Sequence, residues 1–110
     1  MIVRIKDIIN SNFAVSPENG DKVYNDLKER LLLGSTTVLS FEGLEQITTA
    51  FLNNAIAKLY NDFSSKQLNE YLNITDLDTY DKFLLSKVIE RAKLNIANCS
   101  EEIEGEFGNE

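Results

Sequence analysis

Hydrophobic and polar residues follow two different spacings along this chain, and these spacings predict strands and helices in alternation. Residues 2–6 (Ile-Val-Arg-Ile-Lys) alternate loosely and are rich in β-branched side chains, which is typical of a first strand. The Asn-Ser-Asn sequence at residues 10–12 predicts a turn, and a second short strand is expected at residues 13–15. β-Branched and apolar residues predict two further strands, at residues 36–41 and 72–75.

Three segments place apolar residues at the spacing of amphipathic helices. The predicted helices cover residues 17–33, 49–63 and 79–97, with a helical turn or short helix over residues 64–71. Ser16 and Pro17 are a typical N-cap and first helical position for the first helix, and Gly34 fits its C-cap. Asp78 is placed to cap the last helix.

Most aromatic side chains fall on the hydrophobic stripes of these helices, so they are expected in the core. This set comprises Phe51, Tyr60, Phe63, Tyr80 and Phe83, and Phe41 joins it from a strand. The stripe of the last helix consists of Tyr80, Leu84, Leu85, Val88, Ile89, Ala92 and Ile96.

The resulting order β(β)αβαβα predicts an α/β fold in which helices pack on a mixed, largely parallel β-sheet. No repeat or linker divides the chain, so residues 1–99 are expected to form one domain. Residues 100–110 have little to bury, and we expect them to form a mobile acidic tail.

The net charge of −7 is concentrated at the C-terminal end of the chain. Residues 101–110 contain no basic residue and carry Glu101, Glu102, Glu104, Glu106 and Glu110, which leaves the preceding hundred residues at −2. No Lys/Arg cluster is present, so direct binding of nucleic acid is disfavoured. No apolar run is long enough to span a membrane, and charges interrupt the apolar N-terminal segment, which disfavours a signal peptide. Cys99 is the single cysteine, which fits a reducing cytoplasm.

Residue types needed for catalysis or metal binding are sparse. The chain has no His, no Walker-type or other Gly-rich phosphate loop, and no pairing of a nucleophile with a base. Glu42, Glu45 and Asp76 are conceivable as a carboxylate cluster, but a solvated rim is the favoured interpretation. We therefore expect no enzymatic activity, no cofactor and no metal.

The richest candidate site lies where the strand at residues 36–41 leads through Glu42 and Gly43 to a helix that opens at Thr48-Thr49. Helix N-termini carry unpaired N–H groups and partial positive charge, so they favour a phosphate or a carboxylate. Threonine is also an ordinary N-cap residue, and capping is the commoner role. Both interpretations remain open for Thr48 and Thr49.

Residues 37–52 (Thr-Val-Leu-Ser-Phe-Glu-Gly-Leu-Glu-Gln-Ile-Thr-Thr-Ala-Phe-Leu), with the helix that opens at Ser16-Pro17, resemble the STAS-like domain of unknown function of bacteria and phages. The usual form in that family is a strand ending in Asp-Phe-x-Gly-Val, followed by Ile-Ser/Thr-Ser-x-Phe and a helix. Residues 72–77 resemble its last strand, and the resemblance spans roughly residues 2–95. It implies a STAS-like fold for the predicted domain.

That family is similar in turn to anti-sigma-factor antagonists, in which a partner kinase that is also an anti-sigma factor phosphorylates a serine at the start of this helix. Thr49 matches that serine, and Thr48 matches the residue before it. Ser40 stands where an acidic residue is common, and the Asp-Ser-Ser-Gly sequence of true antagonists is absent.

The resemblance implies a non-enzymatic regulatory module that binds a protein, such as a histidine-kinase-type ATPase or an anti-sigma factor. Its predicted contact residues are Glu42, Gly43, Glu45, Thr48, Thr49 and Asn53. One alternative is a small-ligand or nucleotide sensor that binds an anion behind Thr48. Another is an accessory subunit of a bacterial or phage assembly that uses the acidic tail as its contact. The sequence leaves the oligomeric state open.

Overall fold

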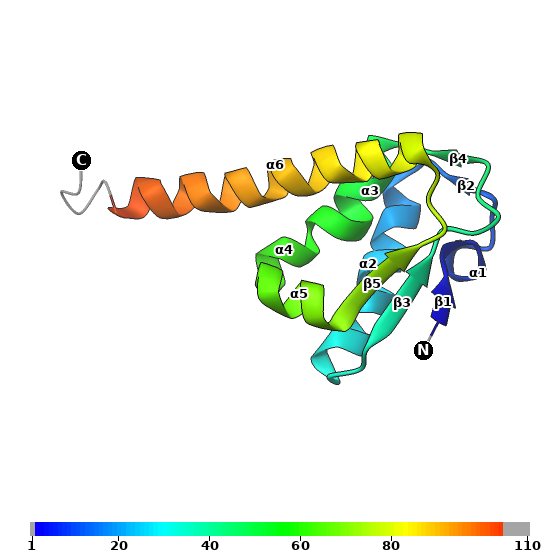
Figure 1. The fold of residues 1–110 in the computed structure, drawn as a ribbon, viewed down its shortest axis with the longest axis horizontal. Coiled ribbons are helices and arrows are strands. Elements are labelled where there is room, and N and C mark those ends of the chain that lie inside the picture. Colours follow the sequence, from blue (N-terminus) through cyan, green and yellow to red (C-terminus); the bar gives the residue numbers. More distant parts are fainter. Residues whose placement is uncertain (1, 105–110) are drawn as a thin grey trace.

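The computed structural model describes the backbone of residues 2–104 and the side chains of residues 2–94 (Figure 1). In chain order the elements are β1 (Ile2–Arg4), α1 (Ile5–Ile9), β2 (Phe13–Ala14), α2 (Pro17–Leu32), β3 (Thr37–Ser40), β4 (Gln46–Ile47), α3 (Thr49–Leu52), the π-helix η1 (Asn53–Ala57), α4 (Leu59–Asp62), α5 (Ser65–Tyr71), β5 (Leu72–Thr75) and α6 (Thr79–Glu104).

The larger sheet is parallel and three-stranded, in the order β1-β3-β5. Val3 lies beside Leu39, and Leu39 lies beside Ile74. Both connections between neighbouring strands cross over through helices, as parallel pairing requires. β2 and β4 form a second, two-stranded parallel ladder. The predicted α/β fold with a largely parallel sheet is confirmed, and every strand pair within residues 2–104 is parallel.

One face of the sheet carries the core, because strand side chains alternate between the two faces. Val3 and Leu39 are buried on that face, whereas Ile2 and Arg4 point to the other face and are exposed. Figure 1 shows α6 as a long helix that crosses the helical side of the molecule and continues past it.

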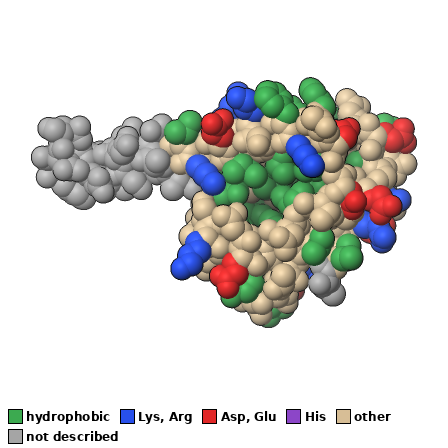
Figure 2. Space-filling view, viewed as in Figure 1, with side chains coloured by type: hydrophobic (Ala, Val, Ile, Leu, Met, Phe, Trp, Pro, Cys, Tyr) green, Lys and Arg blue, Asp and Glu red, His purple; other side chains and the backbone are tan. Residues whose placement is uncertain are grey.

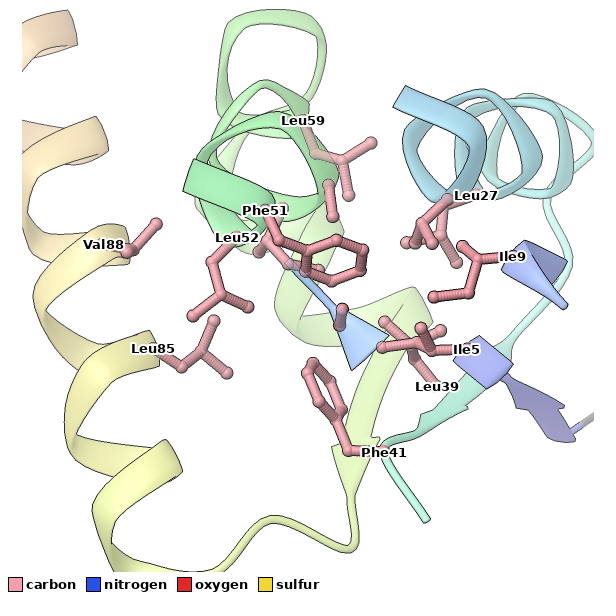
Figure 3. Packing of buried hydrophobic residues seen from close by; sticks show 14 of the residues in the cluster. Ile5, Ile9, Leu27, Leu39, Phe41, Phe51, Leu52, Leu59, Leu85 and Val88 are labelled. Atoms are coloured by element: carbon pink, nitrogen blue, oxygen red, sulfur yellow. The ribbon is translucent and has the colours of Figure 1, made fainter. Parts of the chain in front are cut away.

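The core joins α1, α2, β3, α3 and α6, and its largest fully buried side chain is Phe51. In Figure 3 the Phe51 ring lies between Leu52 on one side and Leu27 on the other, and Leu85 and Val88 approach Leu52 from α6. Phe41 is also buried, as its place on the predicted strand indicated.

The signals at both ends of α2 are confirmed. The Ser16 hydroxyl accepts a hydrogen bond from the Asn19 N–H at 3.1 Å, and Pro17 is the first helical residue. Gly34 has a φ of +77°, and its N–H donates to the carbonyl oxygen of Leu31. This is the left-handed helix ending that glycine adopts without strain.

The prediction of a strand over residues 2–6 was wrong beyond Arg4, where α1 begins. Ile5 and Ile9 are one helical turn apart and both are buried, so the helix places two isoleucines in the core. Asn10 ends the helix in the left-handed conformation at φ 57°. A segment this short has too few residues for its spacing to distinguish a strand from a helix. The burial of Ile5 and Ile9 together favours the helix.

The helix predicted over residues 49–63 is divided into α3, η1 and α4. The Lys58 N–H donates to the carbonyl oxygen of Asn53, five residues earlier, which is the π-helical spacing. No Pro or Gly marks this segment in the sequence. The short helix over α5 and the strand at β5 agree with the predictions.

α6 begins as predicted, with the Asp78 carboxylate accepting the Asp81 N–H at 2.8 Å, but it runs to Glu104 rather than to about residue 97. The rest of the predicted tail, residues 105–110, lies outside the described residues, as does the side chain of Ile96. The prediction that Tyr80 and Phe83 are core residues was wrong. They are 66% and 58% exposed, because α6 packs on the body through Leu85 and Val88 on its other side.

α2 and η1 lie so close together that a residue with a side chain does not fit at Gly20. A Cβ there would lie 2.6 Å from the Phe51 carbonyl oxygen and 2.8 Å from the Asn54 Cβ. We expect Gly20→Ala to lower the free energy of unfolding by about 1 kcal/mol or more, because overpacking outweighs the gain in helix propensity. Denaturant unfolding measures this, with the exposed α2 residue Asn25→Ala as control. A Gly20→Ala protein as stable as the parent would contradict the close packing.

Candidate functional site

The candidate site is the connection between β3 and α3, and a short ladder holds it in place. β4 lies within this connection and pairs with β2, Phe13 beside Gln46 and Ala14 beside Ile47. The Glu45 N–H donates to the Asn12 carbonyl oxygen at 2.7 Å, just before the ladder. The connection is therefore an ordered surface rather than a free loop. Sequence patterns did not reveal β4, since two residues are too few to show a period.

Glu42 and Gly43 form the turn that follows β3. The Glu42 carboxylate pairs with the Arg4 guanidinium at 3.2 Å on the surface. Gly43 has a φ of +84°, and a Cβ there would lie 2.8 Å from the Lys6 Nζ. The turn favours glycine because of this left-handed conformation, whereas the flexible end of the Lys6 side chain can move aside for a Cβ. Arg4, Lys6 and Asn12 border the site, and no motif in the sequence had marked them as site residues.

Thr48 is the N-cap of α3. Its hydroxyl accepts the Phe51 N–H at 3.2 Å and donates to the Val15 carbonyl oxygen at 2.7 Å. The Thr48 N–H also donates to the Ala14 carbonyl oxygen. Thr48 therefore joins the start of α3 to the segment that precedes α2, and its hydroxyl is fully engaged.

Thr49 is the first residue of α3, and its side chain is exposed. Among the described residues, no side chain or carbonyl group forms a hydrogen bond with the Thr49 hydroxyl. Asn53 lies one turn further and is exposed too, as are Glu42, Gly43 and Glu45. The structure therefore separates the two threonines: Thr48 is a structural cap, and Thr49 presents its hydroxyl to solvent.

A small polar cluster lies just behind the Glu42 turn, at the carboxyl ends of β3 and β5. Ser40 is 2% exposed, and its hydroxyl donates to the Asp76 carboxylate at 2.6 Å and accepts the Glu42 N–H at 3.2 Å. Thr75 donates to the same carboxylate oxygen at 3.0 Å. The hydrogen bond from Ser40, then that from Thr75, holds the pKa of Asp76 below its ordinary value, and the charge of Arg4 adds to the effect.

Glu42, Glu45 and Asp76 are not joined into a metal site. Within the described part of the chain, no group of three or more Cys, Asp or Glu side chains is placed to hold a metal ion. Glu45 interacts instead with the Asn12 side chain at 3.3 Å, and Asp76 interacts with Ser40.

An apolar hollow of about 210 Å³ opens elsewhere, between β5, α5 and α6, where Figure 2 shows hydrophobic side chains below α6. It is lined by Ile56, Leu59, Tyr60, Leu68, Asn69, Leu72, Asn73, Ile74 and Ile89. None of these residues belongs to the β3–α3 connection. The hollow does not serve the predicted site.

A parallel sheet with helices on one face, and a central strand that leads into a capped helix, define an α/β domain of STAS-like type. The model of the family described as a STAS-like domain of unknown function (DUF4325) matches residues 19–82. The match covers more than half of the chain, which therefore belongs to this family.

The matched segment contains the whole β3–α3 connection and ends in the first turn of α6. No curated protein and no solved structure matches the chain significantly. Within the described residues, no helix has the length and hydrophobicity needed to cross a membrane.

The two hydrogen bonds of the Thr48 hydroxyl predict that replacing Thr48 costs more stability than replacing its neighbour Thr49. Thr48→Ala removes a cap and a link to Val15, so we expect it to lower the free energy of unfolding by about 1–2 kcal/mol. Thr49→Ala is expected to change it by less than about 0.5 kcal/mol. Denaturant unfolding compares them, with Thr48→Ser as the control that keeps the hydroxyl. Equal losses at both positions would mean that Thr49 also supports the fold.

The lowered pKa of Asp76 predicts a contribution to acid stability. The unfolded chain binds this proton more readily, so the contribution is complete above about pH 4 and is lost as the pH falls through the folded-state pKa. We expect Asp76→Asn to flatten the loss of melting temperature as the pH falls below about 4. Ser40→Ala is expected to raise the pKa of Asp76 toward its ordinary value, measured by NMR titration. An unchanged pKa in Ser40→Ala would contradict the assigned cause.

Proposed function

We propose that the chain is a non-enzymatic regulatory module that binds a protein partner through Glu42, Gly43, Glu45, Thr49 and Asn53. We further propose that phosphorylation of Thr49 releases that partner. The observation that carries the proposal is the division of roles between two adjacent threonines. Because Thr48 alone caps α3, Thr49 is available to a kinase without any cost to the fold.

The chemistry of the surface suits a partner with basic and polar groups. Glu42 and Glu45 are exposed on the connection, and Asn53 offers an amide one turn into the helical stretch. The Glu42–Arg4 ion pair is open to water, so it is readily exchanged for a contact with a partner. The β2–β4 ladder holds the backbone in advance, which reduces the entropy lost on binding.

A phosphate on Thr49 would act through charge and desolvation. It adds about −1.5 to −2 charges in the first turn of α3. The N-terminal end of a helix tolerates that charge, whereas a partner that covers the same spot would have to desolvate it. Binding is then lost while the domain keeps its fold.

Two features support a histidine-kinase-type ATPase or an anti-sigma factor as the partner. The chain belongs to a STAS-like family, and Thr49 stands at the position that resembles the phosphorylated serine of antagonists. The alternative of a bound anion is less favoured, because the Phe51 N–H is already bonded to Thr48 and α3 proper spans four residues. The further alternative, an assembly subunit, rests on an acidic segment partly outside the described residues.

Substitutions at Thr49 test the proposed switch. Thr49→Glu places a carboxylate where the phosphate would be, and we expect it to weaken binding to the native partner about tenfold or more. Thr49→Ala is expected to bind normally and to lose regulation. The partner is identified by affinity capture from the native host, and affinities are then measured by calorimetry with the purified protein.

Thr48→Ala and Asn25→Glu are the matched controls. Thr48→Ala should bind near-normally at a temperature where it is folded, and Asn25→Glu adds the same charge at an exposed α2 residue outside the proposed contact set. Equal affinities for Thr49→Glu and its parent would overturn the switch. Mass spectrometry of protein from the host with no phosphate on Thr49, under conditions that release the partner, would overturn it independently.

A further inference from the structure

α6 carries a second hydrophobic stripe, on the side that faces away from its own domain. Tyr80, Phe83 and Leu94 are 66%, 58% and 57% exposed. Leu85 and Val88, which lie on the other side of the helix, are buried against the body. In Figure 2 the edge of the molecule formed by α6 presents hydrophobic side chains beside basic and acidic ones. Lone exposed apolar residues are ordinary, but three aligned on one helix indicate an interface.

The stripe has the spacing of a coiled-coil seam. Tyr80, Phe83, Lys87, Glu90 and Leu94 follow one another at intervals of three, four, three and four residues. Helices that pair along such a seam pack side chains at these positions against each other. In the middle of the stripe stand one basic and one acidic residue, Lys87 and Glu90, both exposed.

When two copies of α6 run antiparallel, the residues of this seam on one copy face complementary residues on the other. A two-fold axis midway between Lys87 and Glu90 places Lys87 of each copy opposite Glu90 of the other. The same axis places Phe83 opposite Leu94. A parallel pair would instead oppose Lys87 to Lys87 and Glu90 to Glu90. Phe83 and Leu94 meet apolar side chains in either direction, so it is the charges of Lys87 and Glu90 that select the antiparallel arrangement.

We infer that the partner of this stripe is α6 of a second copy of the chain, packed antiparallel with Lys87 opposite Glu90. The outer side of α6 forms an open groove of about 520 Å³ beside this seam, lined by Phe83, Ser86, Lys87, Ile89, Glu90 and Lys93. The Lys87 Nζ lies 5.4 Å from the centre of the Phe83 ring. The central Lys–Glu pairs fix the register, at some cost in affinity relative to an all-apolar seam.

We expect the two domains of this dimer to stay apart. Because the seam lies opposite Leu85 and Val88, each domain remains on the outer side of the helix pair. Most of the seam also follows residue 82, where the match to the family ends. The seam shares no residue with the surface proposed around Thr49, so the test of the dimer and the test of the switch succeed or fail separately.

Charge reversal tests both the dimer and its direction. Sedimentation equilibrium of the full chain should show a monomer–dimer equilibrium. Lys87→Glu and Glu90→Lys should each raise the dimer Kd about tenfold or more, because each places like charges opposite one another. The double variant Lys87→Glu/Glu90→Lys should restore the parent Kd, since each reversed charge again faces its opposite.

A hydrophobic substitution and a cross-link complete the test. Phe83→Ser should weaken the dimer, whereas Leu33→Ser, at a residue 77% exposed at the end of α2, should not. In a Cys99→Ser background, an oxidised mixture of Phe83→Cys and Leu94→Cys chains should form a mixed disulfide. Melting temperatures confirm that each variant is folded. A chain that stays monomeric at all concentrations, or a double variant as weak as either single one, would overturn the inference.

Discussion

The burial of Phe51 anchors the first turn of α3 in the core, and the residues of the candidate site are positioned around that turn. The ring has no exposed surface and lies among side chains of α2, α3 and β3. Burying a side chain of this size contributes roughly 1.5–3 kcal/mol. The Phe51 N–H is bonded to the Thr48 hydroxyl, which caps the helix, and Thr49, two residues before the buried Phe51, faces outward. The close contact between Gly20 and the Phe51 carbonyl oxygen holds the same turn from the other side.

The sequence predicted a structural feature correctly where several neighbouring residues contribute to the same local interaction. The α2 boundaries follow from Ser16, Pro17 and Gly34, each of which satisfies or replaces a backbone group at a helix end. The parallel order of the central strands follows from the helices between them. A capping role for Thr48 was one of two interpretations of the threonine pair, and the hydrogen bonds of Thr48 show that it caps α3. Phosphorylation of Thr49 stays a prediction.

Other features depend on contacts between distant segments, which no local pattern contains. α1 forms because Ile5 and Ile9 reach the core together, although residues 2–6 alternate like a strand. The π-helix η1 lies where Gly20 of α2 packs closely against it. No residue within η1 predicts the π-helical turn. β4 exists because Ala14 and Ile47 meet as neighbours. Tyr80 and Phe83 looked like core residues because α6 has two hydrophobic sides, and the spacing alone does not say which side the domain covers.

The two sides of α6 connect these observations. Its inner side packs on α3 and η1, so the helix that presents Thr49 rests on the helix that carries the outer seam. Binding at one surface could influence the other only if it changed the position of α6. A ligand shifts the balance between two positions only when it binds one of them more tightly than the other. Leu52, Leu85 and Val88 are closely packed and buried, which favours a single position of α6. A phosphate on Thr49 would then act at its own surface, and pairing through α6 would bring two such surfaces into one assembly without altering either.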